Sequence, residues 1–350
     1  MSDASLARLA DAPGLVALAA PPSTLFDLAL VDLDGVAYLG HEPIEHAADS
    51  LVAAQQDGLR LTFVTNNASR EPEAVADQLT SLGIPATAGS VMTAAQACAR
   101  YLGDFVPPGS KVLVVGGAGL RTAVAAAGYE IVASADDEPA AVAQGYVPEI
   151  GWSDLAEAAY AVGRGAVHVA SNLDLSLPTA RGIAPGNGSL VGAVVAATGV
   201  APHSAGKPSP TMYTMAVERA GARRPLVVGD RLDTDLAGAR GAGYVGLHVL
   251  TGVSSGRDDV LAAPGERPHL IAADLRGLGV PHAAPVLDDG WWTSGASAAR
   301  VRDGRLEQGG EPSPDGVDEI RAACAAVWEH VDGGGAIDRT SVPAFEVRAV

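Results

Sequence analysis

A short apolar run that ends in two carboxylates constrains this chain more than any other feature. Leu28-Ala29-Leu30-Val31 is followed directly by Asp32-Leu33-Asp34-Gly35. A short apolar run closed by a turn signal predicts a buried strand, here the central strand of a parallel sheet. In open α/β sheets, ligands bind beyond the carboxyl ends of the strands, which is where both acids fall.

Two carboxylates held this close repel each other unless they share a cation. Mg²⁺ suits such a pair, because it takes few carboxylates and keeps positions for water and phosphate oxygens. A carboxylate can also attack phosphorus and form an aspartyl phosphate. The alternatives are a helix cap or an EF-hand loop, but an EF-hand needs further oxygen ligands that Val36, Ala37 and Leu39 lack. The pattern therefore favours phosphoryl transfer.

Composition narrows the class of protein and its partners. A chain of 350 residues accommodates two or three domains, and a net charge of −18 argues against nucleic acid or an anionic membrane as partner. Cys98 and Cys324 lie far apart in the sequence, which favours free thiols in the cytoplasm over a disulfide. No apolar run reaches the length of a membrane span. We expect residues 1–23 to be a frayed, alanine-rich leader rather than a secretory signal.

Polar residues also follow two other predicted strands. The run 59–64 leads into Thr65, Asn66 and Asn67, and the run 226–229 leads into Asp230. The segment 65–67 by itself would be read equally well as a helix cap. Lys207 precedes a predicted helix over 211–220, and the carboxyl ends of parallel strands share one edge, so these groups can converge. An ammonium, a hydroxyl and Mg²⁺ held by aspartates are what phosphoryl transfer requires.

The predicted elements divide the chain into an α/β core, an insertion and a tail. The glycine run 116–119 lacks the spacing of a dinucleotide site and is read as a tight strand-to-helix turn. Beyond residue 274, a hairpin around 302–305 and a helix over 317–330 indicate a small α+β unit. The predicted fold class is therefore α/β, a doubly wound parallel-sheet core with an inserted α/β cap and a small C-terminal α+β domain. The predicted bounds are 1–23 for the leader, 24–88 and 201–275 for the core, 89–200 for the cap and 276–350 for the C-terminal domain.

These motifs resemble the haloacid dehalogenase superfamily of phosphatases. Asp32-Leu33-Asp34-Gly35 matches its first motif, Thr65 the second, Lys207 the third, and Gly229-Asp230 with Asp235 the fourth. Wider strings are typical of the nitrophenyl-phosphatase-like branch, which has a large α/β cap: Phe63-Val64-Thr65-Asn66-Asn67, Gly206-Lys207-Pro208 and Gly229-Asp230-Arg231. Strings in the insertion look like the mycobacterial-type glycerol 3-phosphate phosphatases: 151–157, 177–179 and 185–189. Members of that group carry a C-terminal domain described as acetyltransferase-like, which we expect to be non-catalytic here.

The resemblance implies roles for the four acids. Asp32 would be the nucleophile, and Asp34 the general acid and then the general base. Asp32, the main-chain carbonyl of Asp34, and Asp230 would hold Mg²⁺. Asp235 would support Lys207 or a metal-bound water from the second shell.

The resemblance also implies a set of residues that bind substrate. Thr65, Asn66 and Lys207 would bind the transferred phosphoryl group, with Asn67 beside them. Asn172, in the insertion, would contact the rest of the substrate.

We therefore expect a Mg²⁺-dependent phosphatase that acts on a small phosphorylated metabolite, glycerol 3-phosphate first, through an aspartyl phosphate. Phosphoglycolate or another small sugar phosphate is the alternative within this class. A non-catalytic protein that binds phosphometabolites on the same fold is the alternative outside it. We expect no nucleic-acid or membrane partner, and a homo-oligomer is left open.

Overall fold

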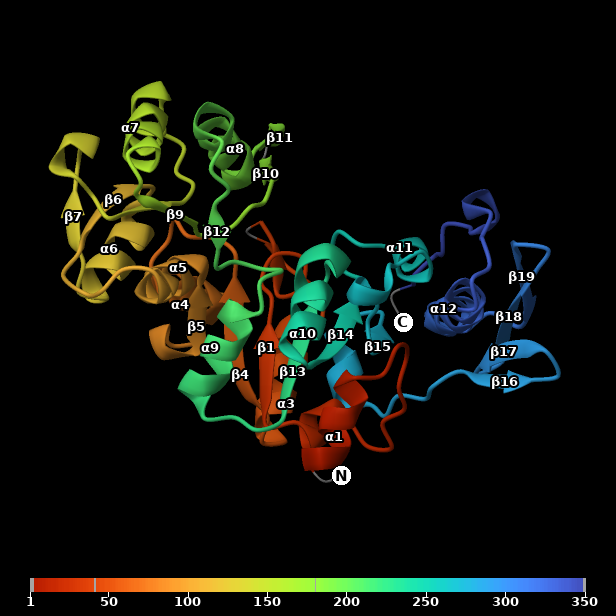
Figure 1. Ribbon diagram of the computed structural model, residues 1–350. Coiled ribbons are helices and arrows are strands. Elements are labelled where there is room, and N and C mark those ends of the chain that lie inside the picture. The colour runs from red at the N-terminus through yellow and green to blue at the C-terminus, as the bar shows by residue number, and fades with distance from the viewer. Residues whose placement is uncertain (1–2, 41, 180, 349–350) are drawn as a thin grey trace. The chain divides into compact units, whose positions relative to one another are not determined.

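The chain folds into two compact units, shown in the computed structural model of Figure 1, which describes residues 3–40, 42–179 and 181–348. The core unit comprises Met1–Phe63, Leu82–Ile84 and Val217–Val350, and the cap unit comprises Val64–Ser81 and Pro85–Ala216. The predicted insertion, residues 89–200, lies within the cap unit.

A parallel sheet forms the centre of the core unit, with strands in the order β15-β14-β13-β1-β4. Its strands are β1 (Leu28–Val31), β4 (Arg60–Thr65), β13 (Pro225–Gly229), β14 (Val245–Val249) and β15 (Leu270–Ala272). Every residue of β1 and β14 is buried, as expected for parallel strands covered on both faces. Val31 pairs with Val228 on one side and with Phe63 on the other, so the predicted central strand is confirmed.

Helices and short strands surround this sheet. They are α1 (Asp3–Ala10), α2 (Pro22–Leu25), β2 (Tyr38–Leu39), β3 (Glu42–Pro43), α3 (Ala47–Gln56), η4 (Leu232–Leu236), α10 (Ala237–Ala242), α11 (Gly256–Val260), η5 (Pro264–Glu266) and η6 (Leu275–Gly279). Helix α9 (Thr211–Ala220) begins in the cap unit and ends in the core unit.

The N-terminal segment packs into the core unit, so the expectation of a frayed leader is wrong. The Val16 N–H donates to the His269 carbonyl, and Leu18 exchanges two main-chain hydrogen bonds with His282. Leu18 is fully buried. The segment lies along the sheet because its apolar side chains are covered there and its backbone groups find partners.

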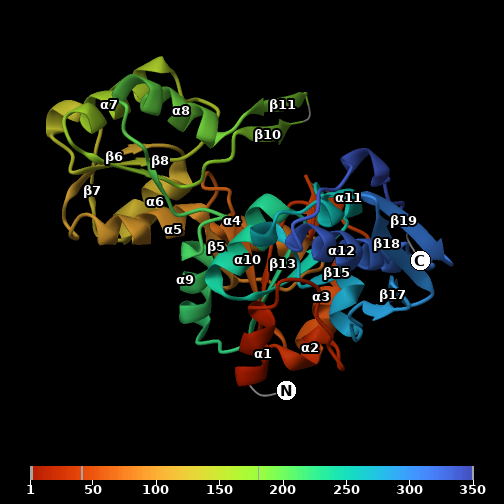
Figure 2. The ribbon, with the colours of Figure 1, turned by 45° about the vertical axis from the view of Figure 1, so that its right-hand side comes forward.

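The cap unit has its own parallel sheet, in the order β12-β9-β8-β6-β7. Its strands are β6 (Lys111–Val115), β7 (Glu130–Val132), β8 (Ala141–Gln144), β9 (Val167–Ala170) and β12 (His203–Ser204). The remaining elements of this unit are α4 (Pro72–Ser81), η1 (Ala88–Ser90), β5 (Val91–Thr93), α5 (Ala94–Tyr101), η2 (Leu102–Asp104), α6 (Ala118–Ala126), η3 (Ala135–Asp137), α7 (Trp152–Gly163), β10 (Ser176–Thr179), β11 (Gly182–Pro185) and α8 (Asn187–Thr198). Within this unit, the antiparallel β10–β11 hairpin extends as a thin ribbon beyond α8 (Figure 2).

Local capping sets where helices of the cap unit begin. Helix α5 begins at Ala94, because Thr93 and Gln96 form a reciprocal capping box that starts it there. The strand-to-helix turn predicted at the glycine run is found, with α6 starting at Ala118.

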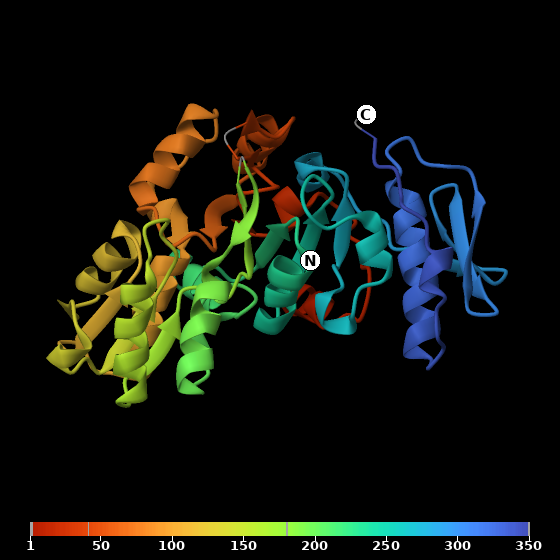
Figure 3. The ribbon, with the colours of Figure 1, turned by 90° about the horizontal axis from the view of Figure 1, so that it is seen from above.

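The C-terminal region forms an antiparallel sheet with one long helix, as predicted. The strands are β16 (Val286–Asp288), β17 (Trp291–Ser294), β18 (Ser297–Arg302) and β19 (Arg305–Gly310), and a 3₁₀ turn, η7 (Arg339–Ser341), follows α12 (Val317–Asp332). Figure 3 shows α12 running along one face of this sheet. On its other side, helix α12 shares an apolar cluster with α11 and β15, which includes Val260, Ile271 and Ile320. The C-terminal region therefore completes the hydrophobic core of the core unit.

None of the helices in the described part of the chain combines the length and apolar character that a membrane crossing requires. Both cysteines are free, as predicted, and both are buried.

The apolar contact between α11 and α12 predicts a stability cost for Ile320→Ala. Ile320 is fully buried, and its Cδ1 lies 2.4 Å from the place of a Cβ on Gly256, so the two helices meet closely there. We expect the free energy of unfolding to fall by about 2–5 kcal/mol, measured by urea unfolding. Val331→Ala on the same helix, where the side chain is 38% exposed, should change it by about 0.5 kcal/mol or less. Equal losses in both variants would contradict a buried contact at Ile320.

Candidate active site

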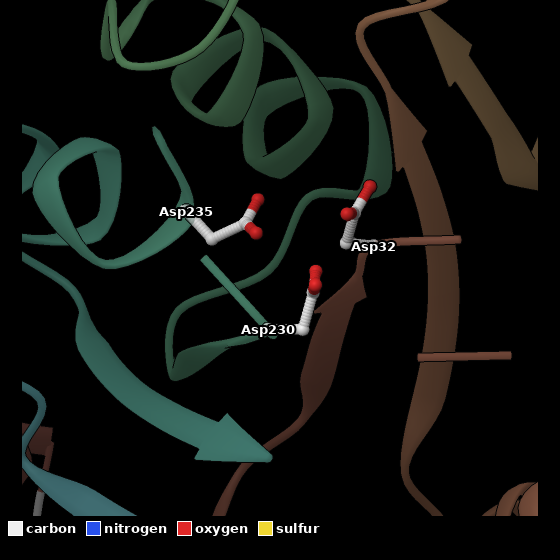
Figure 4. A group of neighbouring side chains, drawn as sticks. All are labelled: Asp32, Asp230 and Asp235. Atoms are coloured by element: carbon white, nitrogen blue, oxygen red, sulfur yellow. The ribbon is translucent and has the colours of Figure 1, made fainter. Parts of the chain in front are cut away.

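Three aspartates of the core unit bring their carboxylates together at the carboxyl ends of β1 and β13. Asp32 follows β1, Asp230 follows β13, and Asp235 lies in η4. One carboxylate oxygen from each lies within 4.8 Å of the others. Figure 4 shows the three side chains close together, with the carboxylates of Asp230 and Asp235 directed into the space between them. Asp230 and Asp235 are fully buried and Asp32 is partly exposed, so the cluster has one accessible member.

The backbone packs so closely around these acids that only glycine fits beside them. A Cβ on Gly252 would lie 2.0 Å from Asp230 Oδ2, and a Cβ on Gly35 would lie 2.4 Å from the same atom. A Cβ on Gly229 would lie 2.4 Å from Cγ of Asp235. The Val253 N–H donates to Asp230 Oδ2 at 2.7 Å. The position of the Asp230 carboxylate is therefore set by sterics and by a main-chain donor.

This donor set fits a hard divalent cation. Three carboxylates at this spacing, two of them fully buried, repel one another and pay a desolvation cost that a shared cation offsets. Oxygen-only ligands are those that Mg²⁺ takes. Asp235 was expected to act only from the second shell, but its carboxylate lies within ligand spacing of the other two.

Asp34 lies in the turn after β1, and its side chain is exposed. The Gly40 N–H donates to Asp34 Oδ1 at 3.2 Å. Gly35, at φ 86°, adopts the left-handed conformation that reverses the chain, and its carbonyl accepts from Thr251 Oγ1 at 2.6 Å. The carboxylate of Asp34 thus stays accessible on a turn held by hydrogen bonds at both ends.

A buried histidine beside the cluster was not identified from the sequence. His248, in β14, is fully buried, and its Nε2 lies 3.2 Å from the main-chain oxygen of Asp230. Its Nδ1 lies 2.9 Å from both carboxylate oxygens of Asp259. Burial alone lowers the pKa of His248, but the Asp259 carboxylate and the Asp230 carbonyl together raise that pKa above its ordinary value. The sequence shows only a histidine within an apolar predicted strand, and this pattern does not reveal which residues the histidine contacts.

The predicted phosphate-binding residues lie together in the cap unit. Lys207 is almost fully buried, and its Nζ donates to the Val64 carbonyl at 3.4 Å. The Lys207 N–H donates to Asn66 Oδ1 at 2.8 Å, and Asn66 Nδ2 donates back to the Lys207 carbonyl at 3.2 Å. Thr65 ends β4, and its hydroxyl oxygen accepts from the Asn67 N–H at 3.1 Å. The segment 65–67 is thus joined to the segment that carries Lys207.

The amides predicted to contact substrate are engaged within the protein. Asn172 Nδ2 donates to the Asn66 carbonyl at 2.7 Å, and Asn172 Oδ1 accepts from the Asp174 N–H at 3.1 Å. Asn66 Nδ2 also donates to Asp174 Oδ2 at 3.1 Å, a partner that was not predicted. Asn67 Oδ1 accepts two hydrogen bonds from Ser69. These side chains hold loops together, and their contacts with substrate stay a prediction.

The family of the chain is shown by comparison with known proteins. Residues 29–130 match the model of haloacid dehalogenase-like hydrolases, and residues 204–278 match a second model of the same class. The chain therefore belongs to the haloacid dehalogenase-like hydrolases, which confirms the resemblance of its motifs and its predicted fold class.

Individual relatives are phosphatases. The chain is 46% identical to D-glycerol 3-phosphate phosphatase of Mycobacterium tuberculosis over 87% of its own length and 86% of the relative's. It is 36% identical to acid sugar phosphatase of Staphylococcus aureus over 65% of its own length and 88% of the relative's. A crystal structure of the glycerol phosphate phosphatase of Mycobacterium tuberculosis in complex with magnesium matches with a TM-score of 0.81, at 44% identity, covering 89% of this chain and 92% of that one.

The tight packing beside Asp230 predicts that Gly252→Ala weakens Mg²⁺ binding. The added methyl group would displace the Asp230 carboxylate, and we expect the dissociation constant for Mg²⁺ to rise by about tenfold or more, measured by isothermal titration calorimetry. Gly265→Ala is the matched control, because a Cβ there meets nothing within 4 Å. Unchanged Mg²⁺ affinity in a folded Gly252→Ala variant would remove Asp230 from the metal site.

Proposed function

We propose that this protein is a Mg²⁺-dependent phosphatase of small phosphate monoesters, and that glycerol 3-phosphate is its first candidate substrate. The observation that carries this proposal is the carboxylate cluster of Asp32, Asp230 and Asp235, which has one accessible member. Buried acids with a single accessible carboxylate suit a site that holds a cation and presents one nucleophile.

The four acids divide the chemical work. Asp32 attacks phosphorus, the bond from phosphorus to the ester oxygen breaks, and Asp34 gives its proton to the departing alcohol. Asp34 then takes a proton from the water that attacks phosphorus and releases Asp32 and phosphate. Asp32, the main-chain carbonyl of Asp34, and Asp230 would hold Mg²⁺, with Asp235 near enough to join them or to orient a bound water. The cation, when bound, neutralises charge on the phosphoryl oxygens.

In this proposal, the polar residues of the cap unit bind the substrate. Lys207 and Thr65 contact the transferred phosphoryl group, because a compact ammonium and a hydroxyl suit its oxygens. Asn66, Asn67 and Asn172 contribute through the loops they hold, in addition to any direct contact. Lys207 is well suited to this task because its segment is fastened by the two hydrogen bonds to Asn66.

Glycerol 3-phosphate is proposed as the first candidate substrate because of how much of the chain each relative matches. The relative that acts on glycerol 3-phosphate is similar over most of both chains, whereas the acid sugar phosphatase matches 65% of this chain. A sugar phosphate is therefore the second candidate. The two free, buried cysteines are consistent with a cytoplasmic enzyme.

Comparison of kcat/KM across phosphate esters with Mg²⁺ tests the substrate. We expect glycerol 3-phosphate to give the highest value among glycerol 3-phosphate, phosphoglycolate and glucose 6-phosphate. Asp32→Asn should abolish turnover of all three, since an amide cannot act as the nucleophile. Asp233→Asn should leave turnover unchanged, because Asp233 is exposed and pairs with Arg231. A wild-type protein that binds these esters without turning them over would instead be a non-catalytic binding protein.

Asp34→Asn tests the role of general acid. The main-chain carbonyl survives this change, but proton delivery to the leaving group is lost, a step typically worth about 10²- to 10⁴-fold in rate. The loss in kcat should be large for glycerol 3-phosphate, which has a poor leaving group, and smaller for 4-nitrophenyl phosphate. Equal losses on the two substrates would contradict the acid role of Asp34.

A further inference from the structure

His248 joins Asp230 to Asp259 of α11 through buried hydrogen bonds within the core unit. The main-chain oxygen of Asp230 is only an acceptor, so His248 Nε2, 3.2 Å away, donates to it. The Ser254 N–H donates to the same oxygen at 3.0 Å. The backbone of Asp230 is thus held by two donors, while its carboxylate is held by the Val253 N–H.

Packing alone gives no reason for a histidine at this position. Every residue of β14 is buried, and the neighbours Leu247 and Val249 are apolar. A buried imidazole and a buried carboxylate cost free energy that an apolar pair of similar volume would avoid. The hydrogen bond from Nε2 to the Asp230 carbonyl connects this pair to the carboxylate cluster.

The orientation of His248 is set by Asp259, and Asp259 is held in turn by the C-terminal helix. Both carboxylate oxygens of Asp259 lie 2.9 Å from His248 Nδ1. Trp328 of α12 donates from Nε1 to the main-chain carbonyl of Asp259 at 3.1 Å. The Trp328 ring lies 5.1 Å from the Arg267 guanidinium, and Arg267 makes two hydrogen bonds with Asp332 near the end of α12. The chain of contacts therefore runs from α12 through α11 and β14 to Asp230.

We propose that His248 is a positioning residue for Asp230 and that Trp328 of the C-terminal region sets its geometry through Asp259. This inference rests on the Mg²⁺ site proposed above. In this proposal, the C-terminal helix α12 helps to orient Asp230 in the core unit. The C-terminal region needs no ligand site of its own for this role.

The first test measures Mg²⁺ binding to full-length variants by isothermal titration calorimetry. His248→Leu should raise the dissociation constant by about tenfold or more, the usual cost of losing an outer contact of a metal ligand. His248→Gln should restore most of the affinity, because its amide donor reaches the Asp230 carbonyl from a similar place. His269→Leu is the matched control: His269 is also fully buried and makes two hydrogen bonds, to Gly246 and Ala10, but none to Asp230.

Stability is measured in parallel, because His248→Leu leaves Asp259 buried without its partner. The double variant His248→Leu/Asp259→Leu removes both polar groups and should regain stability in urea unfolding while its Mg²⁺ affinity stays low. Recovery of the affinity together with the stability would overturn the positioning role. So would an equal loss of Mg²⁺ affinity in His269→Leu.

The link to the C-terminal helix has its own pair of variants. Trp328→Phe keeps an aromatic ring and loses only the donor to Asp259, and it should raise the Mg²⁺ dissociation constant by less than His248→Leu does. Trp292→Phe loses a comparable donor, which bonds Glu329, and should leave the constant unchanged. Equal constants in Trp328→Phe and the wild type would overturn the link. A wild-type protein that binds no Mg²⁺ would overturn the metal site itself, whereas strong wild-type binding with unaffected variants would overturn only the role of His248.

Discussion

The mutual repulsion of three acids at the end of one sheet is the constraint on which the site depends. Asp32, Asp230 and Asp235 place carboxylate oxygens within 4.8 Å of one another, and two of these residues are fully buried. Water screens the two buried charges little. The surrounding backbone makes the arrangement obligatory, because Gly35 and Gly252 leave Asp230 no room to turn away. A cation bound between these carboxylates would offset their repulsion, and the proposed reaction requires a cation at the same place.

A second constraint acts on the backbone that carries these acids. Asp230 follows β13, and its carbonyl, its carboxylate and the following turn are each held by a donor from the core unit. Outer contacts of this kind fix the direction of a metal ligand and are worth as much attention as the ligand itself. In this chain they reach α12, whose apolar face completes the core that Val260 and Ile271 begin. The C-terminal region is therefore part of the core unit's packing rather than an appended module.

The cap unit shows how amide side chains serve as connectors. Asn66 and Lys207 exchange hydrogen bonds through the amide of Asn66 and the main chain of Lys207, and Asn172 fastens to the same segment. A Cβ on Gly206 would lie 2.4 Å from the Ser171 carbonyl, so these loops approach as closely as backbones can. An ammonium placed on such a segment loses little conformational entropy when it meets a phosphoryl group. The rigidity of these loops is thus part of how the unit would recognise substrate.

The sequence alone determined the parallel-sheet class and the central strand at 28–31. It also showed that two of the predicted strands are followed directly by aspartates. Strand patterns and turn residues are local, and the order of motifs along the chain is enough to place them on one sheet edge. It also determined the family, because the motifs are read residue by residue. Only the tertiary structure decided that Asp235 lies within ligand spacing and that His248 faces Asp230. Those contacts join β13, η4 and β14, and they depend on side-chain directions that no local pattern encodes. The N-terminal segment shows the same limit: its composition resembles a loose leader, yet Leu18 is buried and exchanges two main-chain hydrogen bonds with the distant residue His282.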